Sequence, residues 1–215
     1  DGFGNETWAN GDNYQGYYLD NYRHGKGTMN WVDGNKYVGN WVDDAQEGYG
    51  EHFFPNGDIY KGNWKGGNQH GNGESTYING DHYVGNHFQG ARDGKGIYTY
   101  SNGAIFSGNY VNGLEEGKGK ITWQDGEFYE GDWKNGYMAG YGKYVYASGT
   151  TYEGEFLEGS PEGLGKFIYD DGTIYEGEVS DGSENGQGKV NYSNGDFYVG
   201  QFKDGYEHGK GKMVY

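Results

Sequence analysis

Apolar and polar residues alternate in short segments along the whole chain. In residues 129–134, tyrosine, glycine and tryptophan alternate with glutamate, aspartate and lysine, and residues 140–146 show the same period of two. Side chains of a β-strand point to opposite faces in turn, so each segment is predicted to be a strand. Glycine recurs every few residues, which disfavours helices. The pattern therefore predicts two strands of about six residues in each unit, joined by turns.

The pair of strands recurs every 23 residues, and no unit gains or loses a residue. A fixed period of this length is typical of repeat arrays. An aromatic residue opens each unit and a glycine follows two positions later; these aromatic residues are Tyr14, Tyr37, Tyr60, Tyr83, Phe106, Tyr129, Tyr152, Tyr175 and Tyr198. We predict one array over residues 1–215, with a half repeat at 1–13 and units at 14–36, 37–59, 60–82, 83–105, 106–128, 129–151, 152–174, 175–197 and, incomplete, 198–215.

Glycines and aromatic residues share one face of the predicted strands. A ring on one strand can lie across the bare backbone that a glycine leaves on the neighbouring strand, so one sheet can bury its own face without a second layer. We therefore predict an all-β fold, an elongated single-layer antiparallel meander of about 18 strands that forms a twisted or curved rod of 23-residue hairpin repeats.

The chain begins with the second half of a repeat and ends at Tyr215, just before an expected turn. Strands at both ends of the array would leave unpaired edges. We expect either that the sequence is a piece of a longer protein or that an end pairs with another chain, for example in a homodimer formed through a terminal edge strand.

Composition narrows the range of partners. The formal net charge is −16 and the basic residues are not clustered, so nucleic acid is not an expected partner and membrane binding is disfavoured. The chain has no cysteine, which excludes disulfides and thiolate metal sites. It has no run of 18 apolar residues of the kind that spans a bilayer.

No motif in the sequence points to catalysis, a metal or a cofactor. The Gly-x-Gly pairs lack the third glycine of a dinucleotide-binding loop, so we interpret them as part of the turn geometry. His24, His70 and His208 occupy the same position in separate units, too far apart to bind one metal ion. No carboxylate pair or nucleophile constellation stands out. We predict that the protein is not an enzyme and that it binds no cofactor and no metal.

Two sets of residues are candidate partner-binding sites. The first is an aromatic groove, because tyrosine and tryptophan are favoured at interfaces; its residues are Tyr60, Trp64, Tyr83, Tyr129, Trp133, Tyr152, Phe156 and Tyr175. The alternative is that these rings already cover one another. The second lies in residues 147–188, where ten acidic residues accompany Lys166 alone. Its residues Glu153, Glu155, Glu176 and Glu178 form either a solvated face or a landing surface for a basic segment of a partner.

The motif Tyr-x-Gly-x-Trp followed by Gly-x-Gly resembles the MORN (membrane occupation and recognition nexus) repeat over essentially the whole chain. In one unit it is carried by Tyr129, Gly131 and Trp133, followed by Gly140 and Gly142. The resemblance implies an array of hairpins. Similar proteins, among them junctophilins, plant lipid kinases, parasite cytoskeletal rings and ciliary radial spokes, mostly use their repeats to scaffold, dimerise or dock a partner.

From this resemblance we expect a structural scaffold or adaptor that binds a helix or extended segment of a partner protein. The expected setting is a cytoskeletal or ciliary assembly, such as the radial spokes of an axoneme, in the cytoplasm. The main alternative is a peripheral membrane module that binds phosphoinositide headgroups. A further alternative is a sugar-binding platform of aromatic rings.

Overall fold

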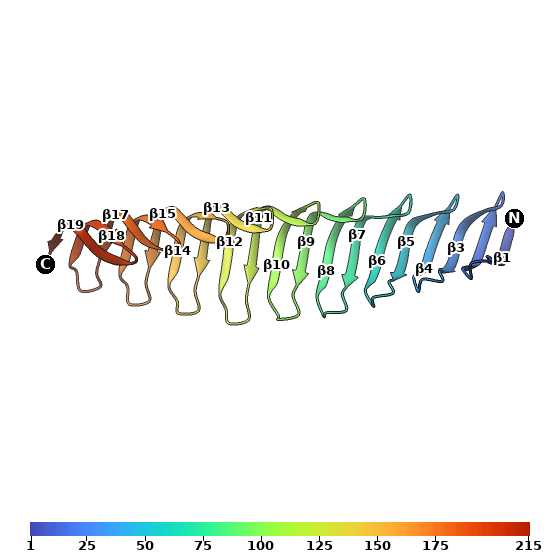
Figure 1. Ribbon diagram of the computed structural model, residues 1–215, viewed down its shortest axis with the longest axis horizontal. Helices are drawn as coiled ribbons and strands as arrows, with labels where there is room; N and C mark the ends of the chain where they lie inside the picture. The colour runs from blue at the N-terminus through green and yellow to red at the C-terminus, as the bar shows by residue number, and fades with distance from the viewer. The chain divides into compact units, whose positions relative to one another are not determined.

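The computed structural model describes residues 1–215 and contains 19 β-strands and no helix. All the strands belong to one open antiparallel sheet (Figure 1). They are β1 (Gly2–Thr7), β2 (Asn13–Leu19), β3 (Tyr22–Asn30), β4 (Lys36–Val42), β5 (Ala45–Phe53), β6 (Ile59–Lys65), β7 (Asn68–Thr76), β8 (His82–Phe88), β9 (Ala91–Thr99), β10 (Ile105–Val111), β11 (Leu114–Thr122), β12 (Phe128–Lys134), β13 (Tyr137–Val145), β14 (Thr151–Leu157), β15 (Ser160–Ile168), β16 (Ile174–Ser180), β17 (Ser183–Asn191), β18 (Phe197–Lys203) and β19 (Tyr206–Val214).

The predicted fold class, an all-β antiparallel meander of hairpin repeats, is confirmed. The strands number 19 rather than about 18, because the half repeat at the start of the chain contributes β1. By its contacts the chain divides into two units, and β10 contributes to both. Unit 1 comprises Asp1–Gly103 and Asn109–Gly113, and unit 2 comprises Ala104–Gly108 and Leu114–Tyr215.

Each repeat is a hairpin of a seven-residue strand and a nine-residue strand, both longer than predicted. In the repeat of β12 and β13, the strands are joined by Asn135 and Gly136, which have φ angles of +50° and +84°. Two consecutive residues with positive φ form a type I′ turn, whose twist matches that of the flanking strands. Asparagine and glycine tolerate this conformation best, which explains their place in the sequence.

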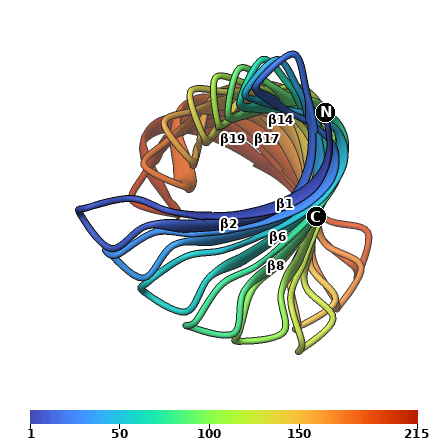
Figure 2. The same cartoon turned by 90° about the vertical axis from the view of Figure 1, so that its right-hand side faces the viewer.

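The Gly-x-Gly pair lies inside the nine-residue strand and not in a turn, which corrects the interpretation made from the sequence. The first glycine, Gly140, has a φ of +55° at a β-bulge, where the register between β12 and β13 shifts after Gly131. The second glycine, Gly142, lies directly opposite Gly131. A bulge bends its strand, and the hairpins are accordingly curved rather than flat (Figure 2).

Tyrosine rings that lie across paired glycines form the core. Tyr129 is fully buried, and a Cβ atom added to Gly142 would lie 2.6 Å from its Cζ atom. A Cβ added to Gly131 would lie 2.6 Å from the Cα atom of Gly142, so both strands must carry glycine here. The Tyr129 hydroxyl donates a hydrogen bond to the carbonyl oxygen of Asp132 at 2.7 Å. The predicted packing of rings over glycine is therefore confirmed.

Candidate partner-binding surfaces

The eight aromatic residues predicted to line a groove form the buried core of the sheet. None of them is more than 8% exposed, and Tyr60, Trp64 and Tyr83 lie in unit 1 while the other five lie in unit 2. Their rings cover one another; those of Tyr129 and Phe156, for example, meet edge to face with centroids 4.7 Å apart. Burial also raises the pKa of Tyr83 to about 12. These rings pack the fold and present no open surface to a partner, because they lie against one another and across the paired glycines.

Two residues of the predicted acidic face, Glu153 and Glu176, pair with lysines on neighbouring strands. Alternating basic and acidic side chains occupy successive strands from β11 to β17 on the sheet face opposite the tyrosines; we call this row the charge ladder, and it consists of Lys120, Glu130, Lys143, Glu153, Lys166, Glu176 and Lys189. Glu153 lies 2.7 Å from the Nζ atom of Lys143, and Glu176 lies 2.8 Å from that of Lys166. The Lys166 ammonium lowers the pKa of Glu176, as expected for an ion pair.

The other two residues of the predicted acidic face lie in the next row of the same face. Glu178 accepts a hydrogen bond from the amide of Gln187 at 3.2 Å, next to the bulge at Gly186. Glu155 occupies the same place in the preceding repeat, beside Gly163. Both side chains are exposed. The four predicted residues therefore share one face but divide into two paired and two bulge-associated carboxylates.

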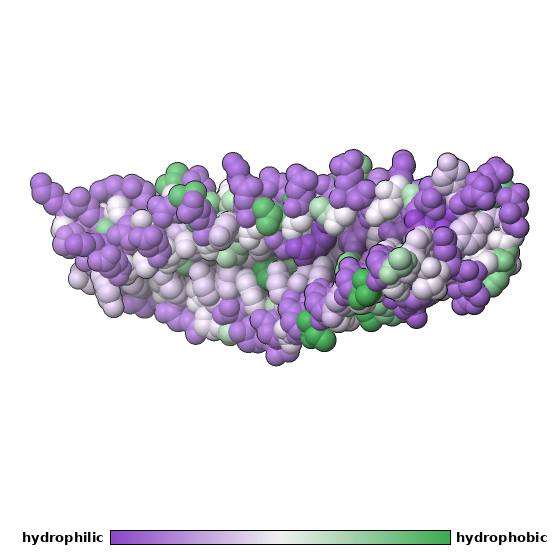
Figure 3. Space-filling model, turned by 45° about the vertical axis from the view of Figure 1, so that its right-hand side comes forward, coloured by the Kyte–Doolittle hydropathy of each residue, from purple (hydrophilic) through white to green (hydrophobic).

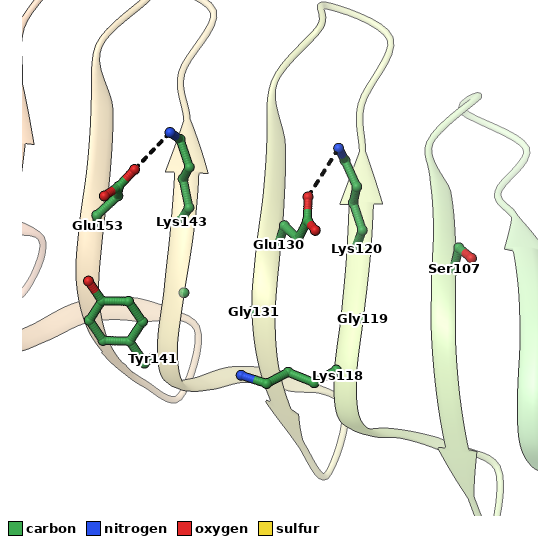
Figure 4. A pocket seen from close by; sticks show the side chains of 10 residues that line it. Ser107, Lys118, Gly119, Lys120, Glu130, Gly131, Tyr141, Lys143 and Glu153 are labelled. Carbon is green, nitrogen blue, oxygen red and sulfur yellow. Dashed lines mark ion pairs between the residues drawn. The ribbon is translucent and has the colours of Figure 1, made fainter.

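An open groove of about 720 Å³ crosses the charge ladder in unit 2. Its floor contains glycines of β11, β12 and β13, and Lys118, Lys120, Lys143 and Tyr141 rise beside it (Figure 4). Each of these lysines is paired with a carboxylate, at 2.7 Å for Lys118 with Asp132, 3.3 Å for Lys120 and 2.7 Å for Lys143. The groove is therefore nearly neutral, and it is not a basic patch.

Unit 1 carries a different groove, of about 460 Å³, on the same sheet face. Its floor includes two glycines of the ring-covered pairs. Exposed apolar side chains stand around it, with Phe3 61%, Tyr17 51% and Tyr49 55% exposed. The rings of Phe3 and Tyr17 meet edge to face at 5.5 Å. The face drawn in Figure 3 is mostly hydrophilic, with small, separate apolar patches.

A polar residue precedes the Gly-x-Gly pair in every repeat except that of Ala139, and in several repeats it has a structural role that was not predicted from the sequence. Glu116 accepts a hydrogen bond from the turn amide of Asn135 in the following repeat at 3.0 Å, and Glu162 does the same for Asp181. These side chains connect a hairpin turn to the repeat that precedes it. The signal in the sequence was the recurrence of Glu, Asp, Asn or His at this position.

No group of three or more histidine or acidic side chains is placed to hold a metal ion. The structure also contains no helix long and apolar enough to cross a bilayer.

Comparison with protein families matches the MORN repeat at residues 1–13, 14–36, 37–59, 60–82, 83–105, 106–128, 129–151, 152–174, 175–197 and 198–215. A search of curated protein sequences found no match.

Among solved structures, the chain resembles the TCP10 domain of Danio rerio CPAP, with 13% identity over 99% of this chain and 98% of that one, and a TM-score of 0.53. A point mutant of that domain matches equally well, at 13% identity and a TM-score of 0.53, over 99% of this chain and 97% of that one. The Drosophila melanogaster SAS-4 TCP domain, solved in complex with a proline-rich motif of Ana2, shares 16% identity over 83% of this chain and 90% of that one, with a TM-score of 0.46.

At these identities the likeness to the TCP10 domain shows a common fold alone. The repeat matches, in contrast, tile the entire sequence, and the nine that follow the half repeat at 1–13 have the ring-over-glycine packing described above. The chain belongs to the MORN repeat family.

Proposed function

We propose that this protein is a non-enzymatic scaffold that binds a segment of a partner protein on the sheet face opposite the tyrosine core. The observation that carries the proposal is the groove of unit 1, where Phe3, Tyr17 and Tyr49 are each more than half exposed around a glycine floor. Aromatic rings on a rigid sheet bury much area at little cost in conformational entropy, as interface residues do.

The repeat geometry supports a segment as the ligand. Equivalent positions recur every two strands, or roughly 10 Å, across the sheet. A segment that crosses the strands therefore meets the same kind of position in each repeat. Several weak contacts along one segment then act together, which raises the overall affinity without any single deep pocket.

The polar side chains of the repeats support a structural role rather than catalysis. Carboxylates such as Glu116 bind turn amides, and those of the charge ladder pair with lysines. Chemistry would need a carboxylate or nucleophile released from such partners and held in a closed cleft. The proposed scaffold needs no cofactor and no metal.

The proposed setting, a cytoplasmic assembly associated with the cytoskeleton or a cilium, rests on the membership of the MORN repeat family. Self-association of two copies through a terminal edge strand is part of the same proposal, because an edge strand is a template for pairing. Sedimentation of the purified chain tests it: a concentration-independent monomer would exclude the homodimer.

The binding experiment uses affinity capture followed by a purified partner. Proteins captured from an extract are identified by mass spectrometry, and binding of the purified partner segment is then measured by calorimetry. We expect Tyr49→Ala to weaken binding at least tenfold, and Tyr137→Ala, a tyrosine of similar exposure beside a hairpin turn of unit 2, to leave it unchanged. Equal affinity of the unaltered protein and Tyr49→Ala would contradict the proposed groove.

A second arm tests the membrane alternative. Vesicles that contain phosphatidylserine and a phosphoinositide are floated with the protein at about 0.15 M salt. We expect no co-flotation, because the lysines of unit 2 are already paired with carboxylates. Strong, charge-dependent co-flotation would replace the protein scaffold with a membrane module.

A further inference from the structure

Two repeats of unit 1 hold an arginine of the chain itself in an aromatic slot on the core side of the sheet. The guanidinium carbon of Arg92 lies 5.6, 4.8 and 5.0 Å from the ring centroids of Tyr83, Tyr98 and Tyr110. Its Nη2 atom donates a hydrogen bond to the carbonyl oxygen of Gly113, in the next hairpin turn, at 2.7 Å. Guanidinium groups bind well over aromatic faces. The fold therefore offers a place for a guanidinium between rings and a turn carbonyl.

Arg23 occupies the corresponding slot three repeats earlier. Its guanidinium carbon lies 4.5 Å from the ring centroid of Trp41, and its Nη2 atom donates to the carbonyl oxygen of Asp44 at 3.1 Å. Asp44 has the same position in its hairpin turn that Gly113 has. The slot is thus a recurring feature of the repeat and not a peculiarity of one.

Four repeats after Arg92, the same position is taken by Glu184, and the slot is a pocket of about 430 Å³. Three of its walls match those around Arg92, and the fourth is smaller. Tyr175, Phe202 and Gly205 occupy the positions that Tyr83, Tyr110 and Gly113 have around Arg92. Val190 occupies the position of Tyr98. The exchange of a tyrosine for the smaller valine enlarges the space that the arginine fills in unit 1. The neighbour opposite Glu184 on β16 is also small, since Val179 stands where most repeats have a ring.

The pocket is acidic. Glu184 is only 9% exposed and accepts a hydrogen bond from the Tyr169 hydroxyl. Glu207 accepts one from the Tyr192 hydroxyl at 2.6 Å, and burial together with this bond raises the pKa of Tyr192 to about 12. None of the ion pairs of the chain involves either carboxylate. A carboxylate has about four acceptor positions, so both can accept further hydrogen bonds.

We propose that the pocket around Glu184 binds the guanidinium group of an arginine side chain from a partner protein. The inference rests on the proposed function and adds a second contact to it: this pocket lies on the core side of the sheet, whereas the groove of unit 1 lies on the opposite face. Arginine fits better than lysine, because its planar group stacks on Tyr175 and Phe202 while its fork of N–H donors reaches Glu184 and Glu207. A buried acidic group without a cation is costly, and the incoming guanidinium offsets that cost.

The first test titrates the full chain with N-acetyl-arginine-amide and follows amide resonances by NMR. We expect saturable shifts of the Gly205 and Glu184 resonances. N-acetyl-citrulline-amide, which has the same shape and no charge, should bind at least tenfold more weakly. Glu184→Gln should weaken the arginine probe at least tenfold, whereas Glu176→Gln, on the opposite sheet face, should not. Equal binding of arginine and citrulline, or an unchanged affinity in Glu184→Gln, would overturn the proposal.

A second variant tests the pocket in a protein that is expected to remain folded. Val190→Tyr restores the ring that unit 1 has at this position, so it should fill the pocket, preserve the thermal unfolding midpoint and abolish the shifts. Persistence of the shifts in a folded Val190→Tyr protein would also refute the pocket.

The same variants separate this inference from the proposed function. If the purified partner binds Val190→Tyr and Glu184→Gln as tightly as the unaltered protein, the arginine pocket is wrong and the scaffold stands. If the unaltered protein captures no partner but binds the arginine probe, the scaffold fails and the assignment of the pocket to a partner's arginine fails with it.

Discussion

The two units share one framework and differ in what they present to solvent. Tyr37 in unit 1 and Tyr129 in unit 2 are both fully buried, and each donates its hydroxyl hydrogen bond to the carbonyl three residues later. On the opposite face, unit 1 carries Val38 where unit 2 carries Glu153 in its charge ladder. The framework positions are constrained by contact with backbone, whereas the positions between them are free to change.

On the core side of the sheet, too, the two units share a position and differ in the residue that occupies it, as the aromatic slot shows. Arg92 and Glu184 occupy equivalent places, with two rings and a turn glycine in common, while Val190 replaces the third ring beside Glu184. A cation held by the chain itself in one unit is replaced by an acid in the other. The repeat therefore fixes the position of a site and leaves its charge open to change.

The largest expected effect comes from breaking the shared framework. Gly50→Val in unit 1 and Gly142→Val in unit 2 both place a side chain where a tyrosine ring lies. Such overpacking against a buried ring costs roughly 3 kcal/mol, because neither the ring nor the paired backbone can move away. Denaturant unfolding measures the loss. A similar loss for both variants supports one framework in both units.

The control for these variants is Glu130→Gln, which changes an exposed member of the charge ladder 3.3 Å from the Nζ atom of Lys120. We expect a change below about 0.5 kcal/mol. If Gly142→Val unfolds at the same denaturant concentration as Glu130→Gln, the packing of rings over glycine is not what stabilises the sheet.

Most of the framework could be predicted from the sequence, because it depends on local pattern. The alternation of Tyr129, Gly131 and Trp133 specifies the strand and its faces, and the 23-residue period specifies the neighbouring strand. The bulge at Gly140 could not be predicted, since glycine is equally compatible with a turn. The burial of the rings depends on contacts between rings of neighbouring repeats, such as Tyr129 and Phe156, which the linear pattern does not show, so the aromatic residues were predicted as an open groove.

The candidate sites were less predictable because they depend on cross-strand register. A linear count from 147 to 188 finds Lys166 alone among acids, but Lys143 and Lys189, just outside that stretch, lie opposite Glu153 and Glu176. The pocket around Glu184 left a weak signal in the sequence, namely the loss of a ring at Val179. Its acidity and its walls depend on which side chains of β16, β17, β18 and β19 lie together.

A titratable core residue distinguishes the units in acid. His87 replaces an aromatic ring in unit 1 and is 4% exposed, and burial lowers its pKa from 6.5 to about 4. The nearest cation, Arg92 on the paired strand, lowers it further. Between about pH 6.5 and pH 4 the unfolded chain binds a proton that the folded chain does not, so stability from His87 is lost as the pH falls through this window.

We expect unit 1 to lose roughly 2 kcal/mol from this source between pH 7 and pH 4.5. Hydrogen exchange should show amides of β8 and β9 losing protection before those of β12 and β13. His87→Phe should remove that difference. If the variant shows the same order of opening as the unaltered protein, His87 is not the origin of the acid sensitivity.

A smaller effect is expected from the tyrosine hydroxyls. Phe106 stands in the tyrosine column without a hydroxyl, so unit 2 already contains a natural comparison. Tyr129→Phe removes the donor to the carbonyl of Asp132 and should destabilise the protein by about 1 kcal/mol, the usual net contribution of one hydrogen bond. Phe106→Tyr should not produce a loss of that size. Thermal unfolding midpoints of the two variants measure both effects. An unchanged midpoint for Tyr129→Phe would show that ring packing alone stabilises the column of tyrosines.

The smallest effect belongs to the charge ladder, which distinguishes unit 2 most visibly. Lys143 and Glu153 are each more than a third exposed, so their pair contributes on the order of 0.5 kcal/mol, and salt screens it. A double-mutant cycle of Lys143→Gln and Glu153→Gln at low and high salt measures that coupling.

Because Glu153 also faces Lys166 across β14 and β15, the single variant Lys143→Gln leaves the carboxylate with a second lysine. The coupling should therefore be smaller than for an isolated pair. A coupling above about 1 kcal/mol that persists in high salt would mean that the ladder stabilises unit 2 as a network, and then the two units would differ in their framework as well as in their surfaces.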